Sequence, residues 1–301
     1  MSGLSFVALG VGDAFSALSY SSCLAVHADG AWLLVDCPHP IRKILRESGR
    51  AAGVDLDVGS FEAVVVTHLH ADHASGLEGF GYFTHFVLDA RPNRRGTSPR
   101  PTVRSPEPNR RGTSPRPTVR SHEPDRSASD PHATMQGDGL RRRVTLLAHP
   151  SVSARLWDGH LAAGMEALMD PATHAVSCHT LPDYFDLRPL SETVPVTAGP
   201  FEISCRRTIH HVPTTALRIR AGGRCLGISA DTCFDPELLA WLSGADLIVH
   251  ETNHGVHTPY EKLAALPSEL RGRMRLIHYP DDFDVARSAI APLRQGTLHA
   301  V

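Results

Sequence analysis

Three histidines and one aspartate stand within six residues, in the segment His68-Leu-His70-Ala-Asp72-His73. Alternate residues of a strand point to the same side, so His68 and His70 are expected to share one metal ion. Asp72 and His73 follow in the turn that would open a helix, close enough to hold a second ion. Imidazole nitrogens and carboxylate oxygens are ligands of zinc, iron and manganese. The spacing therefore predicts a metal centre.

A pair of divalent ions about 3.5–4 Å apart lowers the pKa of a bound water toward neutrality and clamps both oxygens of a displacement. The sequence thus predicts a hydrolase in which a metal-activated hydroxide attacks the substrate. Two Zn²⁺ ions are the first choice, and iron or manganese also suits the mixed nitrogen and oxygen ligands. Nineteen histidines among 301 residues agree with a metal-binding role.

The metal-binding segment directly follows an apolar strand over 62–67, and similar short apolar runs recur along the chain. Strands are predicted at 5–9, 23–27, 32–35, 63–66, 144–147, 201–206, 216–219, 225–228 and 247–249. Helices are predicted at 40–48, 73–79, 154–169, 236–243 and 284–292. Strands arrive in sequential pairs with helices between them. This order predicts an α/β fold, an αβ/βα sandwich of two mixed β-sheets with outer helices.

The segment Thr67–His73 and its preceding strand resemble the metallo-β-lactamase superfamily. Further motifs resemble that superfamily's ribonuclease Z branch, and they are Leu33–Asp36, Ile209–Pro213, Gly227–Thr232, Val249–Thr252 and Leu276–Tyr279. The resemblance covers about 1–90 and 140–301. It implies that the metal ligands are His68, His70, Asp72, His73, His210, Asp231 and His278, with Asp231 bridging the two ions.

The same resemblance implies roles in catalysis. Asp72 would orient the attacking water, and His250 or His257 would stabilise developing charge or protonate the leaving group. Glu251 could orient one of these two rings. The structural alternative is that His250 caps a strand and Glu251 is a solvated or ion-paired residue. His39, His179, His211 and His254 also flank the motifs, and non-ligand roles are favoured for them.

Three departures from the ribonuclease Z pattern argue against tRNA processing. The stretch Val212–Ala230 between two ligands leaves no room for a tRNA-gripping arm, and Ala230 replaces the branch's usual glycine. The chain outside 91–143 carries a net charge of −10, which disfavours long polyanions. We therefore expect a small nucleotide-like or short nucleic-acid phosphodiester as substrate. A lactone or thioester hydrolase and a di-iron redox or sensing protein are the alternatives.

Residues 92–107 and 108–123 are tandem copies that differ only at Pro106 and His122. This Arg- and Pro-rich repeat has no apolar face to bury, so a disordered insertion is predicted at about 91–139 within a single domain of 1–301. Residues 91–143 carry a net charge of +8. The insertion is either a basic arm that contacts phosphates or a solvated loop without a role.

No run of about 18 apolar residues is present, so no membrane span is expected. The first residues lack the basic start of a signal peptide, and the six cysteines form no Cys-x-x-Cys pair. These features predict a reduced, cytoplasmic protein without a membrane partner. The sequence leaves a homodimer open.

Overall fold

The computed structural model describes residues 3–88 and 143–301. The predicted insertion at about 91–139 lies outside the described residues. Within the described part of the chain, no helix is long and apolar enough to span a membrane.

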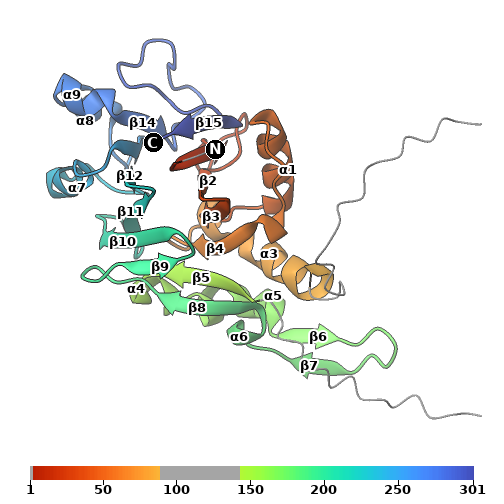
Figure 1. The fold of residues 1–301 in the computed structure, drawn as a ribbon. Helices are drawn as coiled ribbons and strands as arrows, with labels where there is room; N and C mark the ends of the chain where they lie inside the picture. Colours follow the sequence, from red (N-terminus) through yellow and green to blue (C-terminus); the bar gives the residue numbers. More distant parts are fainter. Residues whose placement is uncertain (1–2, 89–142) are drawn as a thin grey trace, which may run out of the picture. The chain divides into compact units, whose positions relative to one another are not determined.

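Two β-sheets form the body (Figure 1). The seven-stranded sheet has the order β15 (Thr297–Ala300), β1 (Ser5–Gly10), β2 (Cys23–Ala28), β3 (Ala31–Val35), β4 (Phe61–Val65), β5 (Val144–Ala148), β8 (Phe185–Pro189). The six-stranded sheet has the order β14 (Met274–Ile277), β13 (Leu247–Glu251), β12 (Arg224–Ile228), β11 (Thr215–Ala221), β10 (Phe201–Arg207), β9 (Val196–Ala198). Both sheets contain parallel and antiparallel pairs, as predicted.

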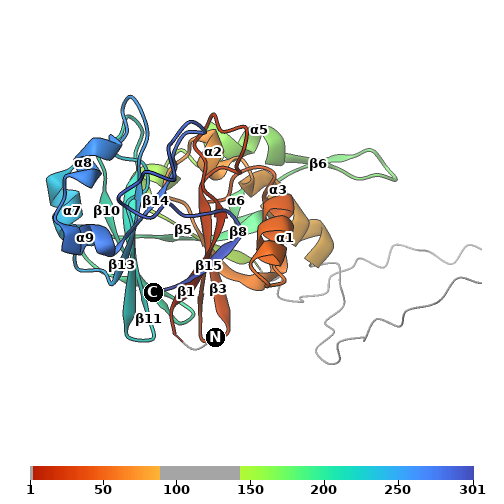
Figure 2. The ribbon, with the colours of Figure 1, turned by 90° about the horizontal axis from the view of Figure 1, so that it is seen from above.

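Helices cover the outer face of each sheet (Figure 2). The seven-stranded sheet packs against α1 (Ile41–Ala51) and α3 (Leu77–Phe83), and the six-stranded sheet packs against α7 (Pro236–Leu242) and α8 (Tyr260–Ala264). The remaining helices are short, and they are α2 (Ala71–Ala74), α4 (Pro150–Ser153), α5 (Ala162–Met165), α6 (Leu181–Tyr184), α9 (Ser268–Gly272), η1 (Val58–Ser60), η2 (Thr84–Leu88) and η3 (Trp157–Leu161). The predicted αβ/βα sandwich is confirmed.

Strand β1 is apolar apart from Ser5 because both of its faces are buried. In β1, Phe6 and Ala8 belong to the core between the sheets, whereas Val7 and Leu9 pack against the outer helices. Strands covered on both sides show continuous apolar runs instead of an alternation with polar residues. This is why the sequence identified the central strands well.

The predicted helix over 154–169 is wrong at its carboxyl end. Helical structure stops at Met165, and the following residues form a hairpin of β6 (Ala167–Met169) and β7 (Val176–Cys178). Met165 is fully buried, but Met169 is largely exposed on this hairpin, which extends from the body in Figures 1 and 2. The helix therefore ends four residues before the predicted carboxyl end.

The predicted helix over 284–292 is also wrong. Asp284 accepts hydrogen bonds from the N–H groups of Ala286 and Arg287, as at a helix start, but the segment then leaves this conformation. The N–H of Leu276 donates instead to the carbonyl of Ala291, and Ile290 is buried in the outer core. Pairing with the edge of β14 thus replaces the helix.

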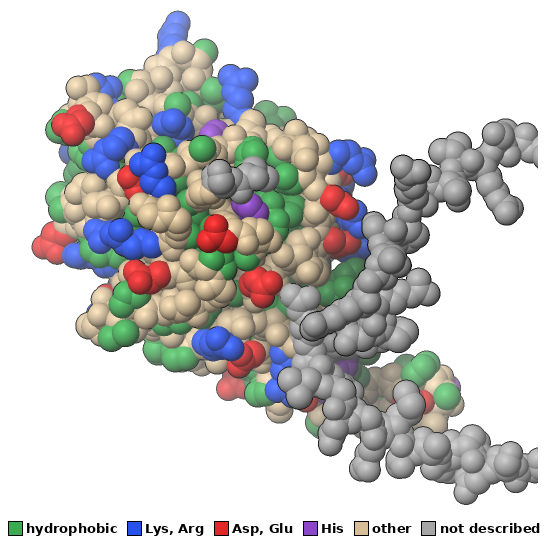
Figure 3. Space-filling view, in the orientation of Figure 1, with side chains coloured by type: hydrophobic (Ala, Val, Ile, Leu, Met, Phe, Trp, Pro, Cys, Tyr) green, Lys and Arg blue, Asp and Glu red, His purple; other side chains and the backbone are tan. Residues whose placement is uncertain are grey.

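Positively and negatively charged side chains are interspersed on the face shown in Figure 3.

The metal-ligand candidates lie at the carboxyl ends of strands. Parallel pairing of β3 with β4 and of β12, β13 and β14 with one another brings the carboxyl ends of five strands to one edge of the sandwich. Strand order therefore decides which polar residues meet.

Candidate metal centre

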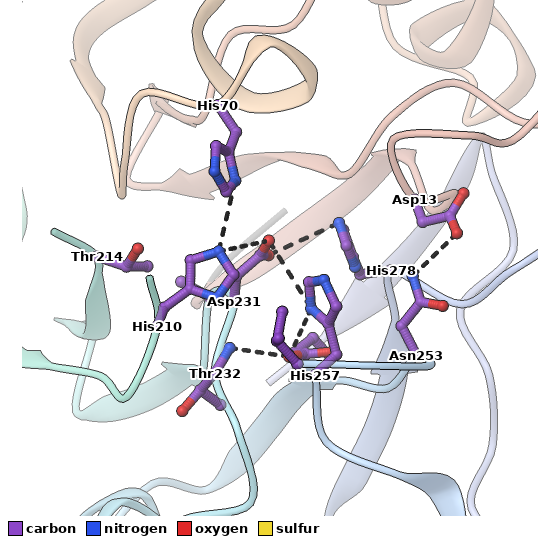
Figure 4. Close-up of polar contacts among 12 residues, drawn as sticks. Asp13, His70, His210, Thr214, Asp231, Thr232, Asn253, His257 and His278 are labelled. Atoms are coloured by element: carbon purple, nitrogen blue, oxygen red, sulfur yellow. Dashed lines mark hydrogen bonds and ion pairs between the residues drawn. The ribbon is translucent and has the colours of Figure 1, made fainter. Parts of the chain in front are cut away.

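One edge of the sandwich brings together all seven residues that the sequence proposed as metal ligands. His68 and His70 follow β4, and Asp72 and His73 lie in α2. The ligands from the other sheet come from loops after three strands: His210 after β10, Asp231 after β12 and His278 after β14. Figure 4 shows four of them, His70, His210, Asp231 and His278, converging from different elements.

The first cluster consists of His68, His70, His210 and Asp231, whose ligand atoms all lie within 4.8 Å of one another. His68 Nε2 lies 3.5 Å and His210 Nε2 3.8 Å from Asp231 Oδ2. The His70 ring closes the group, with Nδ1 3.1 Å from His68 Nε2. Three imidazoles and a carboxylate form a donor set typical of zinc.

The second cluster consists of Asp72, His73 and His278, again with ligand atoms within 4.8 Å. Asp72 Oδ2 lies 3.3 Å from His73 Nε2 and 3.2 Å from His278 Nε2. Both histidines are almost fully buried.

Asp231 joins the two clusters. Its Oδ2 faces His68 and His210, whereas its Oδ1 lies 3.3 Å from His73 Nε2 and 3.7 Å from His278 Nε2. A carboxylate whose two oxygens face two ligand groups is the arrangement that a bridging ligand requires. The geometry therefore agrees with the bridging role that the resemblance implied.

Second-layer residues orient the ligands. Asp36 Oδ2 accepts a hydrogen bond from His73 Nδ1 at 2.8 Å, so Nε2 of that ring carries no proton in the neutral form and faces the cluster. Asp36 also accepts from Thr67, whose hydroxyl lies 3.0 Å from His68 Nδ1. Hydrogen bonds to the second ring nitrogen fix the orientation of metal-binding histidines. Thr67 was not among the site residues predicted from the sequence, although its position directly before His68 could have indicated a contact with that ring.

The charges of the pocket suit cations. Burial lowers the pKa of His70 to about 4 and that of His210 to about 3, so both rings are neutral, the form that binds metals. Burial also opposes ionisation of Asp231, but the neighbouring His73 and His278 outweigh it and hold the pKa of that carboxyl well below its usual value. The carboxylates Asp231 and Asp36 in turn raise the pKa of His73 despite its burial. The site therefore favours positive charge between these residues.

Buried polar atoms without hydrogen-bond partners test whether metal ions fit. Among the described residues of the clusters, His73 Nε2 and Asp231 Oδ1 are such atoms that face other ligand candidates. Leaving buried polar atoms unpaired is costly, so such atoms require an explanation. His73 Nε2 and Asp231 Oδ1 face each other across the second cluster, where one cation would satisfy both. These residues fit divalent metal ions.

Backbone strain is concentrated at this edge. Asp36, Ala230 and His278 all have positive φ, at 60°, 50° and 59°. Residues other than glycine rarely adopt this conformation, and it is found at functional sites where the surroundings enforce it. The three residues follow β3, β12 and β14, and the positive φ of each redirects the chain at the end of the strand toward the ligand candidates.

His257 and Glu251 meet beside the two clusters. His257 Nδ1 lies 3.1 Å from Glu251 Oε1, and the same oxygen accepts from the N–H of Thr232. His257 also forms a third ligand-type group with Asp231 and His278. Burial disfavours the charged imidazole, but the hydrogen bond to Glu251 outweighs it and raises the pKa of His257. The raised pKa favours the protonated form of an imidazole that lies next to the ligand candidates.

The structure does not bring the side chain of His250, which the sequence proposed as catalytic, to the ligand candidates. Within the described part of the chain, its side chain bonds through Nδ1 to the carbonyl of Glu251, and it is fully buried. Since strand residues alternate, His250 shares the face of Ile248, which packs in the outer core, while Glu251 shares the opposite face with Val249. Glu251 itself is buried and bonded to His257, so it is an ion-pairing residue at the site.

Other residues near the site had no role in the sequence-based set. Asn253 donates to Asp13 at 2.9 Å and thereby ties the loop of His257 to the loop after β1, as Figure 4 shows. His211 Nε2 lies 3.0 Å from His70 Nε2, but among the described residues neither His211 nor His254 belongs to a ligand cluster. No local spacing links Asp13 to Asn253, so the sequence could not have indicated this pair.

Comparison with known proteins decides the family. The family model described as "Anti-Pycsar protein Apyc1" matches residues 4–94 and 133–295. The chain belongs to the Apyc1 family. Anti-Pycsar protein Apyc1 of Paenibacillus sp. (strain J14) is 26% identical over 291 residues, which cover 93% of this chain and 91% of that protein. The unmatched stretch between the two parts of the family match contains most of the tandem repeat.

Two further likenesses are informative. Over 135 residues, the chain is 26% identical to the cGMP-dependent 3′,5′-cGMP phosphodiesterase A of Dictyostelium discoideum, covering 39% of this chain and 16% of that protein. The metallo-β-lactamase fold protein YhfI from Bacillus subtilis superposes with a TM-score of 0.65 at 16% identity, covering 98% of both chains. The metallo-β-lactamase fold predicted for this Apyc1-family chain is confirmed.

Proposed function

We propose that this chain hydrolyses the phosphodiester bond of a small cyclic nucleotide, using two divalent metal ions of which zinc is the first choice. The observation that carries the proposal is the position of Asp231 between two ligand clusters, one oxygen facing each. The substrate class is supported by the Apyc1 family membership and by the likeness to a 3′,5′-cGMP phosphodiesterase.

In this proposal the ligands divide as the two clusters do. His68, His70 and His210 would hold one ion, and Asp72, His73 and His278 would hold the other, with Asp231 shared. When bound, the ions supply Lewis acidity toward the phosphate and lower the pKa of water. Asp72 would also orient the attacking water through a carboxylate oxygen, which is the role that the resemblance implies.

His257 is the proposed proton donor to the leaving oxygen, and Glu251 positions its ring. Glu251 Oε1 holds Nδ1 of His257, which leaves Nε2 as the atom that can meet the substrate. General acid catalysis of this kind contributes about 10²–10⁴ to a rate. Since His250 faces the outer core, the proposal gives it a packing role.

Space beside the centre suits a small substrate. A groove of about 730 Å³ adjoins the first cluster at His210 and His211, and a hollow of about 450 Å³ includes Asn253 and His254 on the other side. Small-molecule sites in proteins have volumes of about 300–1,000 Å³. The groove's Arg206 and Arg207 are already paired with Glu237 and Glu192, so they provide no free basic surface for a long polyanion. We also propose a cytoplasmic setting, because all six cysteines are free.

The test is turnover of metal-loaded protein on 3′,5′-cyclic nucleotides beside bis-p-nitrophenyl phosphate and a panel of lactones and thioesters. We expect phosphodiester hydrolysis that is lost on chelation and restored by Zn²⁺, with two metals per chain by elemental analysis. Turnover of esters without any phosphodiester turnover would contradict the proposal. Visible absorbance with bound iron and no hydrolysis would favour a redox or sensing protein.

A further inference from the structure

The loop between β1 and β2 exposes two large apolar side chains. Phe15 is 91% and Leu18 79% exposed, more than any other large hydrophobic side chain among the described residues. Two large apolar side chains exposed on one short loop provide a surface on which an apolar or aromatic group can bind.

The loop is held in one conformation by hydrogen bonds. The N–H of Phe15 donates to Asp13 Oδ1 at 2.9 Å, while the Ser16 hydroxyl and the N–H of Ala17 donate to the two oxygens of Asp281 at 2.5 and 2.7 Å. These bonds lower the pKa of Asp281. Its carboxylate thus remains an acceptor near neutral pH, and Phe15 is presented on a fixed loop.

This loop lies directly beside the proposed metal centre. The N–H of the ligand His278 donates to the carbonyl of Val11 at 2.8 Å, and Asp13 accepts from Asn253 on the loop that carries His257. Phe15 is four residues beyond Val11, so the two Cα atoms are at most about 15 Å apart. Figure 2 shows the loop after β1 next to α2, the helix that carries Asp72 and His73.

The two sides of the centre differ in chemistry. On the side of His210, the groove is lined by charged residues, among them the ion-paired Arg206 and Arg207. On the side of His278, the loop presents an exposed aromatic ring and Leu18. Nucleobases bind aromatic rings by stacking.

We infer that Phe15 is the surface on which the base of the substrate stacks, with Leu18 beside it, while the phosphodiester lies at the ligand clusters. The inference rests on the proposed function and adds to it a residue that selects nucleotides over other phosphodiesters. Stacking has little preference among bases, so Phe15 would favour the presence of a base more than its identity.

The test compares two substrates that share the sugar and the cyclic phosphodiester. One is 3′,5′-cyclic GMP, and the other is methyl riboside 3′,5′-cyclic phosphate, which has no base. In zinc-loaded Phe15→Ala, the ratio of kcat/KM for the first substrate to that for the second should fall about tenfold, since stacking is measured at about 1–3 kcal/mol per base. Phe15→Trp should keep the ratio of the unchanged protein.

Phe86→Ala is the matched control. Phe86 is another exposed aromatic residue (52%), and it lies on η2, which follows α3 along the chain. The ratio of this control variant should not change. An unchanged ratio in Phe15→Ala would overturn the inference and leave the proposed function standing. If this variant also formed a smaller oligomer with the same ratio, Phe15 would be a contact between chains and not a surface for the base. If the unchanged protein hydrolyses neither substrate, the proposed function fails, and the inference fails with it.

Discussion

The two sheets contribute to the ligand clusters in different ways. The seven-stranded sheet supplies His68, His70, Asp72 and His73 from one short segment, while the six-stranded sheet supplies His210, Asp231 and His278 from three separate loops. A contiguous motif can be recognised without knowing the fold. The scattered set depends on parallel pairing of β12, β13 and β14, which brings distant residues to the same edge. Asp231, the residue proposed to bridge the two ions, belongs to the scattered set.

The largest expected effect is the loss of kcat on replacing Asp231, the proposed bridging residue, compared with replacing His70, a proposed ligand of one cluster. Asp231→Ala should lower kcat on a phosphodiester by about 10³ or more, since it disturbs both ion sites and metal ions contribute several kcal/mol to the transition state. His70→Ala should cost less, about 10², because it affects one cluster. Steady-state kinetics with metal analysis of both variants would measure this. Equal losses would contradict the bridging role, and normal activity in both would refute the metal centre.

The next effect compares neighbours on β13. Glu251→Gln should lower kcat about 10²-fold, because the uncharged side chain no longer holds His257 as a proton donor. His250→Ala should change kcat less than about threefold and lower the melting temperature instead, since it empties a buried site facing the outer core. Kinetics and thermal unfolding of both variants check this. A larger kcat loss in His250→Ala than in Glu251→Gln would reverse the assignment.

Second-layer support on the seven-stranded side should act on metal affinity. Asp36→Asn should weaken binding about 10–100-fold, because Asp36 orients His73 through a 2.8 Å hydrogen bond. The measurement is a titration with a chelating competitor. Thr67→Val is the matched comparison, and it should weaken affinity less because it removes the hydroxyl that contacts Asp36 and His68 but leaves the Asp36 carboxylate in place. No change in Asp36→Asn would mean that the fold alone positions His73.

The smallest effect lies away from both ligand sets. Burial raises the pKa of Asp57, but the hydrogen bond from Arg42, the N–H of Val58 and the charge of Arg46 outweigh burial and lower it. The ionised group therefore stabilises the fold above about pH 4, and this contribution is lost as the pH falls through the lowered pKa. Asp57→Asn should lower the unfolding free energy by about 1 kcal/mol at pH 7 and by less at about pH 3.

Urea unfolding at the two pH values measures the Asp57 effect. Turnover should remain that of the unchanged protein, because Asp57 caps η1 and lies outside the ligand clusters. If the loss of stability in Asp57→Asn grew as the pH fell, the carboxylate would not be the stabilising form.

The sequence predicted the central strands and the contiguous ligands because both depend on local patterns. Continuous apolar runs mark strands buried on both faces, and four ligand-type residues after one of them are hard to explain otherwise. Errors came where distant contacts decide the outcome. Residues 284–292 look helical but pair with the edge of β14, and Met169 leaves its helix to join β6.

The site shows the same division. Side chains alternate along β13, so Glu251 points toward the ligand candidates and His250 points away from them. The motif alone did not indicate which of the two residues faces the site. The bond between Asp13 and Asn253 joins segments 240 residues apart, and nothing local in the sequence encodes it. The single-domain organisation with an insertion at about 91–139 stays a prediction.

The left-handed backbone at three strand ends has a consequence for how this edge can vary in evolution. Asp36 and His278 need their side chains, so neither can be exchanged for the glycine that their φ values would prefer. Ala230 has no such duty, and glycine there would avoid a penalty of about 1–2 kcal/mol. Of the three positions, 230 is thus the one where selection for stability and selection for activity do not compete. Substitutions at this edge in related proteins are therefore expected at position 230 before positions 36 and 278.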